Sequence, residues 1–235
     1  MVYVLPYTTS NTWTNLIIEY IESGQSQHAL RMYQAMQEMV FTQSINPYNY
    51  VNMFKACANV ADLKMGKVLH EEAWAKTWLK DNAFIGSTII MMYGKCGCII
   101  EAKKVFDELS ERDVVTWNAM IGVYIHNGLG KDAIKVFIKM QNSGLLPNEG
   151  TFVSVLSACT TEATLALGRH IHFWIISSGY DDHTTLGSAL MHMYAKCGSI
   201  EDAYNPSNRA LLRDLVSWNT MISSYAQHGY GKEAL

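Results

Sequence analysis

The sequence predicts an all-α protein, a right-handed superhelical α-solenoid of helix–turn–helix repeats. Two observations support this prediction. Apolar residues recur at helical spacing in short stretches separated by turn residues, and the same residue strings return at intervals of about a hundred residues. A single hairpin of two short helices cannot bury both of its apolar faces. Each hairpin must therefore pack on its neighbours along the chain.

The clearest hairpin spans residues 114–148. Its first helix is predicted over 115–126 and ends at Asn127-Gly128, because both residues tolerate the left-handed conformation that ends a helix. Its second helix is predicted over 131–142, and Gly144 and Pro147 prevent it from continuing. The apolar faces of the two helices are formed by Trp117, Met120, Ile121, Tyr124, Ala133, Val136, Phe137 and Met140.

Recurring strings divide the chain into blocks of three unlike hairpins. WNAMI at 117–121 returns as WNTMI at 218–222, and YGKCG at 93–97 returns as YAKCG at 194–198. Gly66 and His70 return as Gly168 and His172. The predicted repeat units are 10–46, 47–82, 83–113, 114–148, 149–183, 184–214 and 215–235, after a flank of residues 1–9. The last unit stops inside its second helix, so we expect the sequence to be a fragment of a longer chain.

One unit departs from its counterpart. Residues 203–210 read AYNPSNRA where 102–109 read AKKVFDEL, which places Pro206 inside the expected second helix. Proline in a helix interior costs about 3 kcal/mol or more. We therefore predict a broken or shifted helix between residues 205 and 210.

Composition and motifs exclude several classes of function. The net charge of −3 and pI near 6.2 argue against a non-specific polyanion binder, and no apolar run reaches membrane-spanning length. No targeting peptide is visible at the N-terminus. The chain contains no P-loop, G-x-S-x-G or H-E-x-x-H string. We expect no enzyme, no cofactor, no metal site, no membrane and no small-molecule substrate.

Cysteine and histidine residues recur with the repeats. Cys57 and Cys159 each follow an alanine, and Cys96 and Cys197 each lie in a Lys-Cys-Gly string. Buried packing positions explain this recurrence, with redox or metal chemistry as the alternative, and Cys98 adds only a lone C-x-C. We expect the recurring His70 and His172 to pack or form hydrogen bonds within their own hairpins.

The recurring strings resemble the plant pentatricopeptide repeat proteins of the PLS subclass, in which units called P, L and S alternate. The resemblance is carried by VVTWNAMIGVYIHNGLGKDAIKVFIKMQNSGLLPN at 114–148 for P, TFVSVLSACTTEATLALGRHIHFWIISSG at 151–179 for L, and LGSALMHMYAKCGSIEDA at 186–203 for S. It extends over residues 10–235. The expected protein is therefore a fragment without the C-terminal E or DYW-type region of that subclass. Neither the H-x-E nor the P-C-x-x-C string of a zinc cytidine deaminase occurs here.

The resemblance implies that the fifth and last residues of a unit together read one RNA base. The implied pairs are Asn118 with Asn148 for a pyrimidine, Ser87 with Asp113 and Ser188 with Asp214 for guanine, and Thr14 with Asn46 for adenine, while Asn219 has its partner beyond the sequence. In the L units the pairs are Val51 with Asn82 and Val153 with His183, which should select little because valine has no hydrogen-bonding group. The second residues Phe84, Val115 and Val216 are implied to flank the bases by apolar packing.

The implied function is sequence-specific binding of single-stranded organellar RNA, in a mitochondrion or a chloroplast. The chain would act as the target-recognition factor in C-to-U editing or other RNA processing, with further factors supplied in trans. Lys64, Lys95, Lys196 and Arg169 are candidates for phosphate contacts, and a solvated surface is the equal alternative. The rival interpretation is a helical-repeat scaffold that binds a protein or peptide on its concave face.

Overall fold

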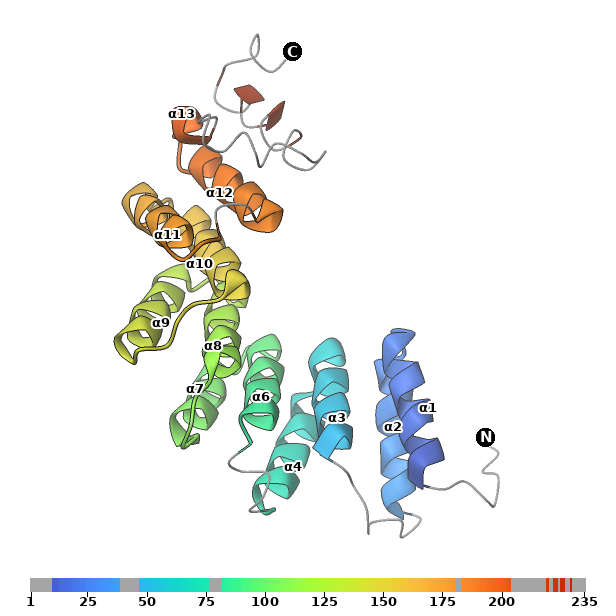
Figure 1. The fold of residues 1–235 in the computed structure, drawn as a ribbon. Coiled ribbons are helices and arrows are strands. Elements are labelled where there is room, and N and C mark those ends of the chain that lie inside the picture. Colours follow the sequence, from blue (N-terminus) through green and yellow to red (C-terminus); the bar gives the residue numbers. More distant parts are fainter. Residues whose placement is uncertain are drawn as a thin grey trace. The chain divides into compact units, whose positions relative to one another are not determined.

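The computed structural model describes residues 10–38, 47–76, 82–180 and 183–203, together with Asn219, Ile222, Ser223, Tyr225, Ala226 and Gly229. Every element named in these ranges is an α-helix (Figure 1). The chain forms two compact parts, residues 1–127 and 128–235, each of which is described by itself. None of the described helices is long and apolar enough to cross a bilayer.

The N-terminal part is built from consecutive helix pairs. Its helices are α1 (Ser10–Glu22), α2 (Ser26–Glu38), α3 (Pro47–Val60), α4 (Leu63–Trp74), α6 (Ala83–Lys95), α7 (Ile99–Glu108) and α8 (Val114–His126). Helix α3 packs on α1, α2, α4 and α6, and α6 packs in turn on α7 and α8. The first helices α1, α3, α6 and α8 therefore follow one another in a row, as the ribbon shows (Figure 1).

The C-terminal part repeats this arrangement. It contains α9 (Gly130–Asn142), α10 (Glu149–Glu162), α11 (Leu165–Ser177), α12 (Thr184–Lys196) and the short α13 (Ile200–Ala203). Helix α10 packs on α9, α11 and α12, and α12 packs on α11 and α13. The description of this last hairpin ends at Ala203, so the helix break predicted at Pro206 lies outside the described residues.

Two kinds of turn end the first helices. Gly24, Gly97 and Gly128 have φ between +72° and +77°, the left-handed conformation that closes a helix end at little cost for glycine. In the hairpins 47–82 and 149–183 the left-handed residue is an alanine, Ala61 at φ 54° and Ala163 at φ 49°. The hairpins 47–82 and 149–183 thus differ from the hairpins that turn at Gly24, Gly97 and Gly128 in the chemistry of their turns.

The recurring glycines allow close helix packing. A Cβ atom placed on Gly66 would lie 2.5 Å from the Sδ atom of Met92, and one on Gly168 would lie 2.3 Å from the Sδ atom of Met193. Both glycines are buried in a second helix that faces the first helix of the next hairpin. Their return in the sequence therefore marks a repeated contact between neighbouring hairpins.

Candidate nucleic-acid interface

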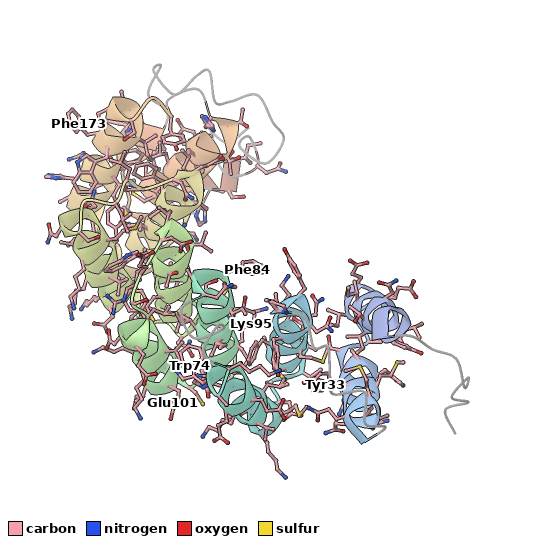
Figure 2. The ribbon with its side chains drawn as sticks, turned by 60° about the horizontal axis from the view of Figure 1, so that its bottom comes forward. Tyr33, Trp74, Phe84, Lys95, Glu101 and Phe173 are labelled. Carbon is pink, nitrogen blue, oxygen red and sulfur yellow. The ribbon has the colours of Figure 1, made fainter. Side chains whose placement is uncertain are left out.

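The starts of three first helices in the N-terminal part expose apolar side chains at the same position. Phe84 and Val115, the second residues of α6 and α8, are each 51% exposed. Tyr48 occupies the same position in α3 and is 65% exposed. Phe84 and Val115 were predicted from the sequence to flank bases; Tyr48 was not, although its place after Pro47 gives it the same register. Figure 2 shows Phe84 at the start of α6, away from Trp74 and Glu101 of the second helices α4 and α7.

Ser87, the proposed reading residue of α6, lies deeper than these side chains. It is 4% exposed, and its hydroxyl donates to the backbone carbonyl oxygen of Phe84 at 2.9 Å. The proton of Ser87 is thus engaged within the helix, and its oxygen keeps acceptor capacity. Asp113, the implied partner of Ser87, is exposed at the start of α8, and the α8 helix packs against α6.

The last residues of the repeat units are N-caps of the following helices. The Oδ1 atom of Asp113 accepts hydrogen bonds from the backbone N–H of Thr116 at 2.8 Å and from its hydroxyl at 2.7 Å. The Oδ1 atom of Asn148 accepts from the N–H and hydroxyl of Thr151, each at 3.0 Å. The backbone N–H of Asn148 donates to the same hydroxyl at 3.2 Å, which completes a capping box.

Two further unit ends behave differently. The Oδ1 atom of Asn82 accepts from the backbone N–H groups of Phe84 and Ile85, at 3.0 and 3.2 Å. His183 makes no side-chain cap for α12, and its Nδ1 atom lies 3.4 Å from the Oε2 atom of Glu149. The capping roles were not predicted from the sequence, although Asp or Asn just before a helix is a visible helix-start signal.

The other implied base-reading residues are placed only in part. Asn118 and Thr14 are half-buried on α8 and α1, and Asn219 is exposed. Ser188 is half-buried on α12, where its hydroxyl donates to the carbonyl oxygen of Thr184 at 3.1 Å. Val51 is buried, and Val153 is half-buried. The remaining members of the implied set lie outside the described residues: Asn46, Asp214 and Val216.

The recurring histidines form hydrogen bonds with the next hairpin, so the expectation of hydrogen bonds within their own hairpins was wrong. The ring of His70 does pack within its own hairpin, on Trp74 of α4, with the ring centres 4.7 Å apart. The Nδ1 atom of His70 lies 2.9 Å from the hydroxyl of Tyr93, and that of His172 lies 2.9 Å from the hydroxyl of Tyr194. Burial lowers the pKa of both imidazoles, and burial also raises the pKa of both tyrosines to about 12. Each pair joins a second helix to the first helix that follows it.

Two arginines already have partners within the protein. Arg169 donates to the Oδ2 atom of Asp202 from its Nη2 and Nε atoms, at 2.7 and 3.1 Å, which makes it a poor candidate for a phosphate contact. Arg112 donates to the backbone carbonyl oxygens of Phe106 and Asp107, at 2.7 and 2.8 Å. Lys64, Lys95 and Lys196 are exposed, as a phosphate contact or a solvated surface would each require.

The cysteines are free thiols. Cys57 and Cys159 are buried, as expected of packing positions, and burial raises their pKa values to about 12 and about 11. Cys96, Cys98 and Cys197 are half-buried. A thiol with a raised pKa is a weak nucleophile and a poor metal ligand at neutral pH. The buried Cys57 and Cys159 therefore serve as packing residues.

Comparisons with known proteins agree with the repeats found in the sequence. A model of the PPR repeat family matches residues 112–161, and a PPR repeat model matches 11–40, 87–114 and 216–235. Together these segments cover more than half of the chain. Among curated proteins, pentatricopeptide repeat-containing protein At2g33680 of Arabidopsis thaliana is 37% identical over 96% of this chain. Protein At4g35130 of the same plant, named chloroplastic, is 34% identical over 94%. The chain spans only 31% and 27% of the lengths of these two relatives.

Solved structures show the same fold. The pentatricopeptide repeat protein PPR10, in complex with an 18-nt psaJ RNA element, matches 97% of this chain and 34% of its own with a TM-score of 0.75 and 22% identity. The structure of PPR10 from maize matches 97% of this chain and 38% of its own with a TM-score of 0.62 and 19% identity. The likeness confirms the predicted fold class, an all-α solenoid of helical repeats.

Proposed function

The chain belongs to the pentatricopeptide repeat family, and from this premise we propose that it binds single-stranded RNA at the starts of its first helices. The observation that carries the proposal is the repeated pairing of an exposed apolar side chain with a fixed hydrogen-bonding group. Phe84 and Val115 offer apolar surface for base faces, and Asp113 lies between them in the sequence. Apolar surface next to a polar edge suits an unpaired base, whose face and edge differ in the same way.

The caps define which group each unit end offers to a base. Both hydrogen bonds that Asp113 accepts from Thr116 end on Oδ1, so Oδ2 is the oxygen on the other side of the carboxylate. A carboxylate oxygen only accepts, and it complements the ring N–H of guanine. In Asn148 the capping atom is also Oδ1, which makes Nδ2 the atom on the other side. This amide nitrogen only donates, so it complements the unprotonated ring nitrogen of cytosine better than the ring N–H of uracil.

The size of the fifth residue supports the same assignment. Ser87 is small and lies nearly buried beneath the surface, which leaves room above it for a purine. Asn118 is larger and half-buried at the corresponding place on α8. The proposed bases are therefore guanine for Ser87 with Asp113 and a pyrimidine for Asn118 with Asn148. By the family resemblance we also propose guanine for Ser188 with Asp214 and adenine for Thr14 with Asn46.

We also propose a biological role on the basis of the relatives. The alternation of P, L and S units favours the PLS subclass, and relatives named chloroplastic favour an organelle. In this role the chain is the target-recognition part of a longer protein that takes part in C-to-U editing or other RNA processing. The full protein and its partners in trans would supply any chemistry.

A base-swap experiment tests the proposal. The purified chain is titrated with short single-stranded RNAs that carry the proposed bases and differ only at the nucleotide assigned to Asp113. The wild type should prefer guanine. The variant Asp113→Asn should prefer adenine, because adenine has an unprotonated ring nitrogen where guanine has an N–H. Asn148 shows that asparagine still caps a helix in this fold, so the variant should fold. Equal binding of all RNAs by both proteins, or no binding, would contradict the proposal and favour the protein-binding scaffold.

A further inference from the structure

A buried threonine lies behind each of two proposed base-reading groups. Thr116 and Thr151, the third residues of α8 and α10, have no exposed surface. Each directs its hydroxyl at the Oδ1 atom of the preceding unit end, Asp113 at 2.7 Å and Asn148 at 3.0 Å. A carboxylate has no proton to give, so the hydroxyl of Thr116 must be the donor.

The hydroxyl is not needed to cap the helix. Asn82 caps α6 through the backbone N–H groups of Phe84 and Ile85, and the third residue of that helix is the aliphatic Ile85. Ile85 is fully buried, so this position accepts an apolar side chain. Burial of a hydroxyl is unfavourable unless it is hydrogen-bonded. The hydroxyls of Thr116 and Thr151 therefore supply a hydrogen bond to the preceding side chain that an aliphatic residue could not supply.

We propose that Thr116 and Thr151 are positioning residues, which orient Asp113 and Asn148 for base recognition. This inference rests on the proposed function. A single backbone N–H holds Oδ1 but leaves the side-chain plane free to turn about that bond. A second donor on the same oxygen, from the side chain of a buried residue, fixes the plane and so the direction of the other atom. That other atom is Oδ2 in Asp113 and Nδ2 in Asn148.

The threonine also selects which way the amide of Asn148 faces. The backbone N–H of Thr151 only donates, so the atom opposite it must be the oxygen. The hydroxyl of Thr151 accepts from the backbone N–H of Asn148 at 3.2 Å, which directs its own proton to Oδ1. Two donors converging on one atom exclude the flipped amide, in which Nδ2 would meet them. The buried Thr151 therefore determines that Nδ2 of Asn148, a donor, is the atom directed toward the base.

The cation next to Asp113 does not disturb this arrangement. Arg112 donates its Nε and Nη2 protons to the carbonyl oxygens of Phe106 and Asp107 at the end of α7, and its guanidinium lies over the ring of Phe106 with its Cζ atom 5.0 Å from the ring centre. The orientation of Asp113 therefore follows from Thr116 and not from its charged neighbour.

The test compares base discrimination in Thr116→Val and Thr116→Ser. Valine keeps the shape and removes the hydroxyl, and serine keeps the hydroxyl. The readout is the ratio of dissociation constants for single-stranded RNAs with guanine and with adenine at the nucleotide assigned to Asp113. Thr116→Val should reduce this ratio about three- to tenfold, the range of one hydrogen bond, and Thr116→Ser should preserve it. Discrimination at the next nucleotide, assigned to Asn118 and Asn148, should not change, because a general loss of structure would affect both.

Two results separate the inference from the proposed function. An unchanged ratio in Thr116→Val, together with a reversed preference in Asp113→Asn, overturns the positioning role and leaves base reading intact. An unchanged preference in Asp113→Asn overturns both. If Thr116→Val does not fold, Thr151→Val gives the same test at the nucleotide assigned to Asn148, where preference for cytosine over uracil should weaken and Thr151→Ser should retain it.

Discussion

Two helical glycines on neighbouring helices give a sharp test of how the hairpins pack. Gly94 of α6 is buried, and a Cβ atom added there would lie 2.3 Å from the Cγ2 atom of Val123 and 3.0 Å from its Cβ and Cγ1 atoms. Valine in a helix has one strongly preferred χ1 rotamer, so its methyl groups cannot swing away. Gly122 of α8, one residue before Val123, has no described atom within 4 Å of an added Cβ.

The same substitution should therefore have opposite effects at the two sites. Glycine to alanine in a helix interior gains about 0.5–1 kcal/mol from backbone entropy, at either site. Overpacking of a close helix contact costs about 1–3 kcal/mol. Gly122→Ala should raise the free energy of unfolding by about 0.5–1 kcal/mol. The free energy of unfolding of Gly94→Ala should be lower than that of Gly122→Ala by about 1–3 kcal/mol, because both variants gain the same backbone entropy and only Gly94→Ala is overpacked.

The displacement should also reach a hydrogen bond between the same helices. The Nδ2 atom of Asn127 donates to the carbonyl oxygen of Gly94 at 3.0 Å, and it donates to the carbonyl oxygen of Val123 at 2.8 Å. Separation of α6 from α8 would lengthen the bond to Gly94. Amide hydrogen exchange should then show faster opening of both helices in Gly94→Ala, a local readout that suits a repeat array better than one global transition.

Urea unfolding followed by far-ultraviolet circular dichroism measures the effect, and a double-mutant cycle identifies its cause. Val123→Ala removes both methyl groups that the new Cβ would meet. Combined with Gly94→Ala, it should cost clearly less than the sum of the two single changes, a coupling of about 1 kcal/mol or more. Equal stabilisation by Gly94→Ala and Gly122→Ala, or strictly additive effects in the cycle, would refute the packing argument.

Two further predictions concern the caps and the histidine pairs. Asn148→Ala should destabilise the start of α10 by about 1 kcal/mol, whereas Asn148→Asp should be nearly neutral, because an aspartate can keep the cap; thermal melts of the two variants check this. Burial lowers the pKa of His70 below its ordinary 6.5, against the opposing charges of Glu108 and Glu71. The unfolded chain therefore binds more protons below this pH, so the stability contributed by neutral His70 is complete above pH 6.5 and is lost as the pH falls. The wild type should lose more stability between pH 7.5 and 5.5 than His70→Gln, and parallel losses in urea unfolding would contradict this assignment.

The sequence predicted the helices well because each one carries local signals for its own limits. The helix predicted over 115–126 is observed as α8 (Val114–His126), and the helix predicted over 131–142 is observed as α9 (Gly130–Asn142). Apolar spacing sets the face of such a helix, and Asn127-Gly128 or Gly144 sets its end. These signals lie within a few residues of the effect that they have, so no knowledge of the neighbouring hairpin is needed.

Contacts between hairpins were harder to predict, because they depend on how successive helices stack. His70 and His172 recur in the sequence, and so do Tyr93 and Tyr194, but no local pattern says that they meet. The close approach of Gly94 to Val123 is equally invisible in the sequence. In the candidate interface the residue types could be assigned by resemblance. Their exposure could not, and Ser87 proved nearly buried while Tyr48 proved open.

The caps suggest a physical reason for the residue types at unit ends. A residue there must offer an oxygen to the first N–H groups of the next helix, which favours aspartate and asparagine. Both use the Oδ1 atom as the cap, and they differ in the second atom of the side-chain group, the acceptor Oδ2 in Asp113 and the donor Nδ2 in Asn148. Exchange of one for the other should therefore change the base that is read at little cost in stability. His183 is the contrasting case, because it leaves α12 without a side-chain cap and its unit has Val153 at the fifth position. Asn82 also ends a unit with a valine at the fifth position, Val51, and it still caps α6. A unit end that does not read a base can therefore keep its capping role, as Asn82 does, or lose it, as His183 does.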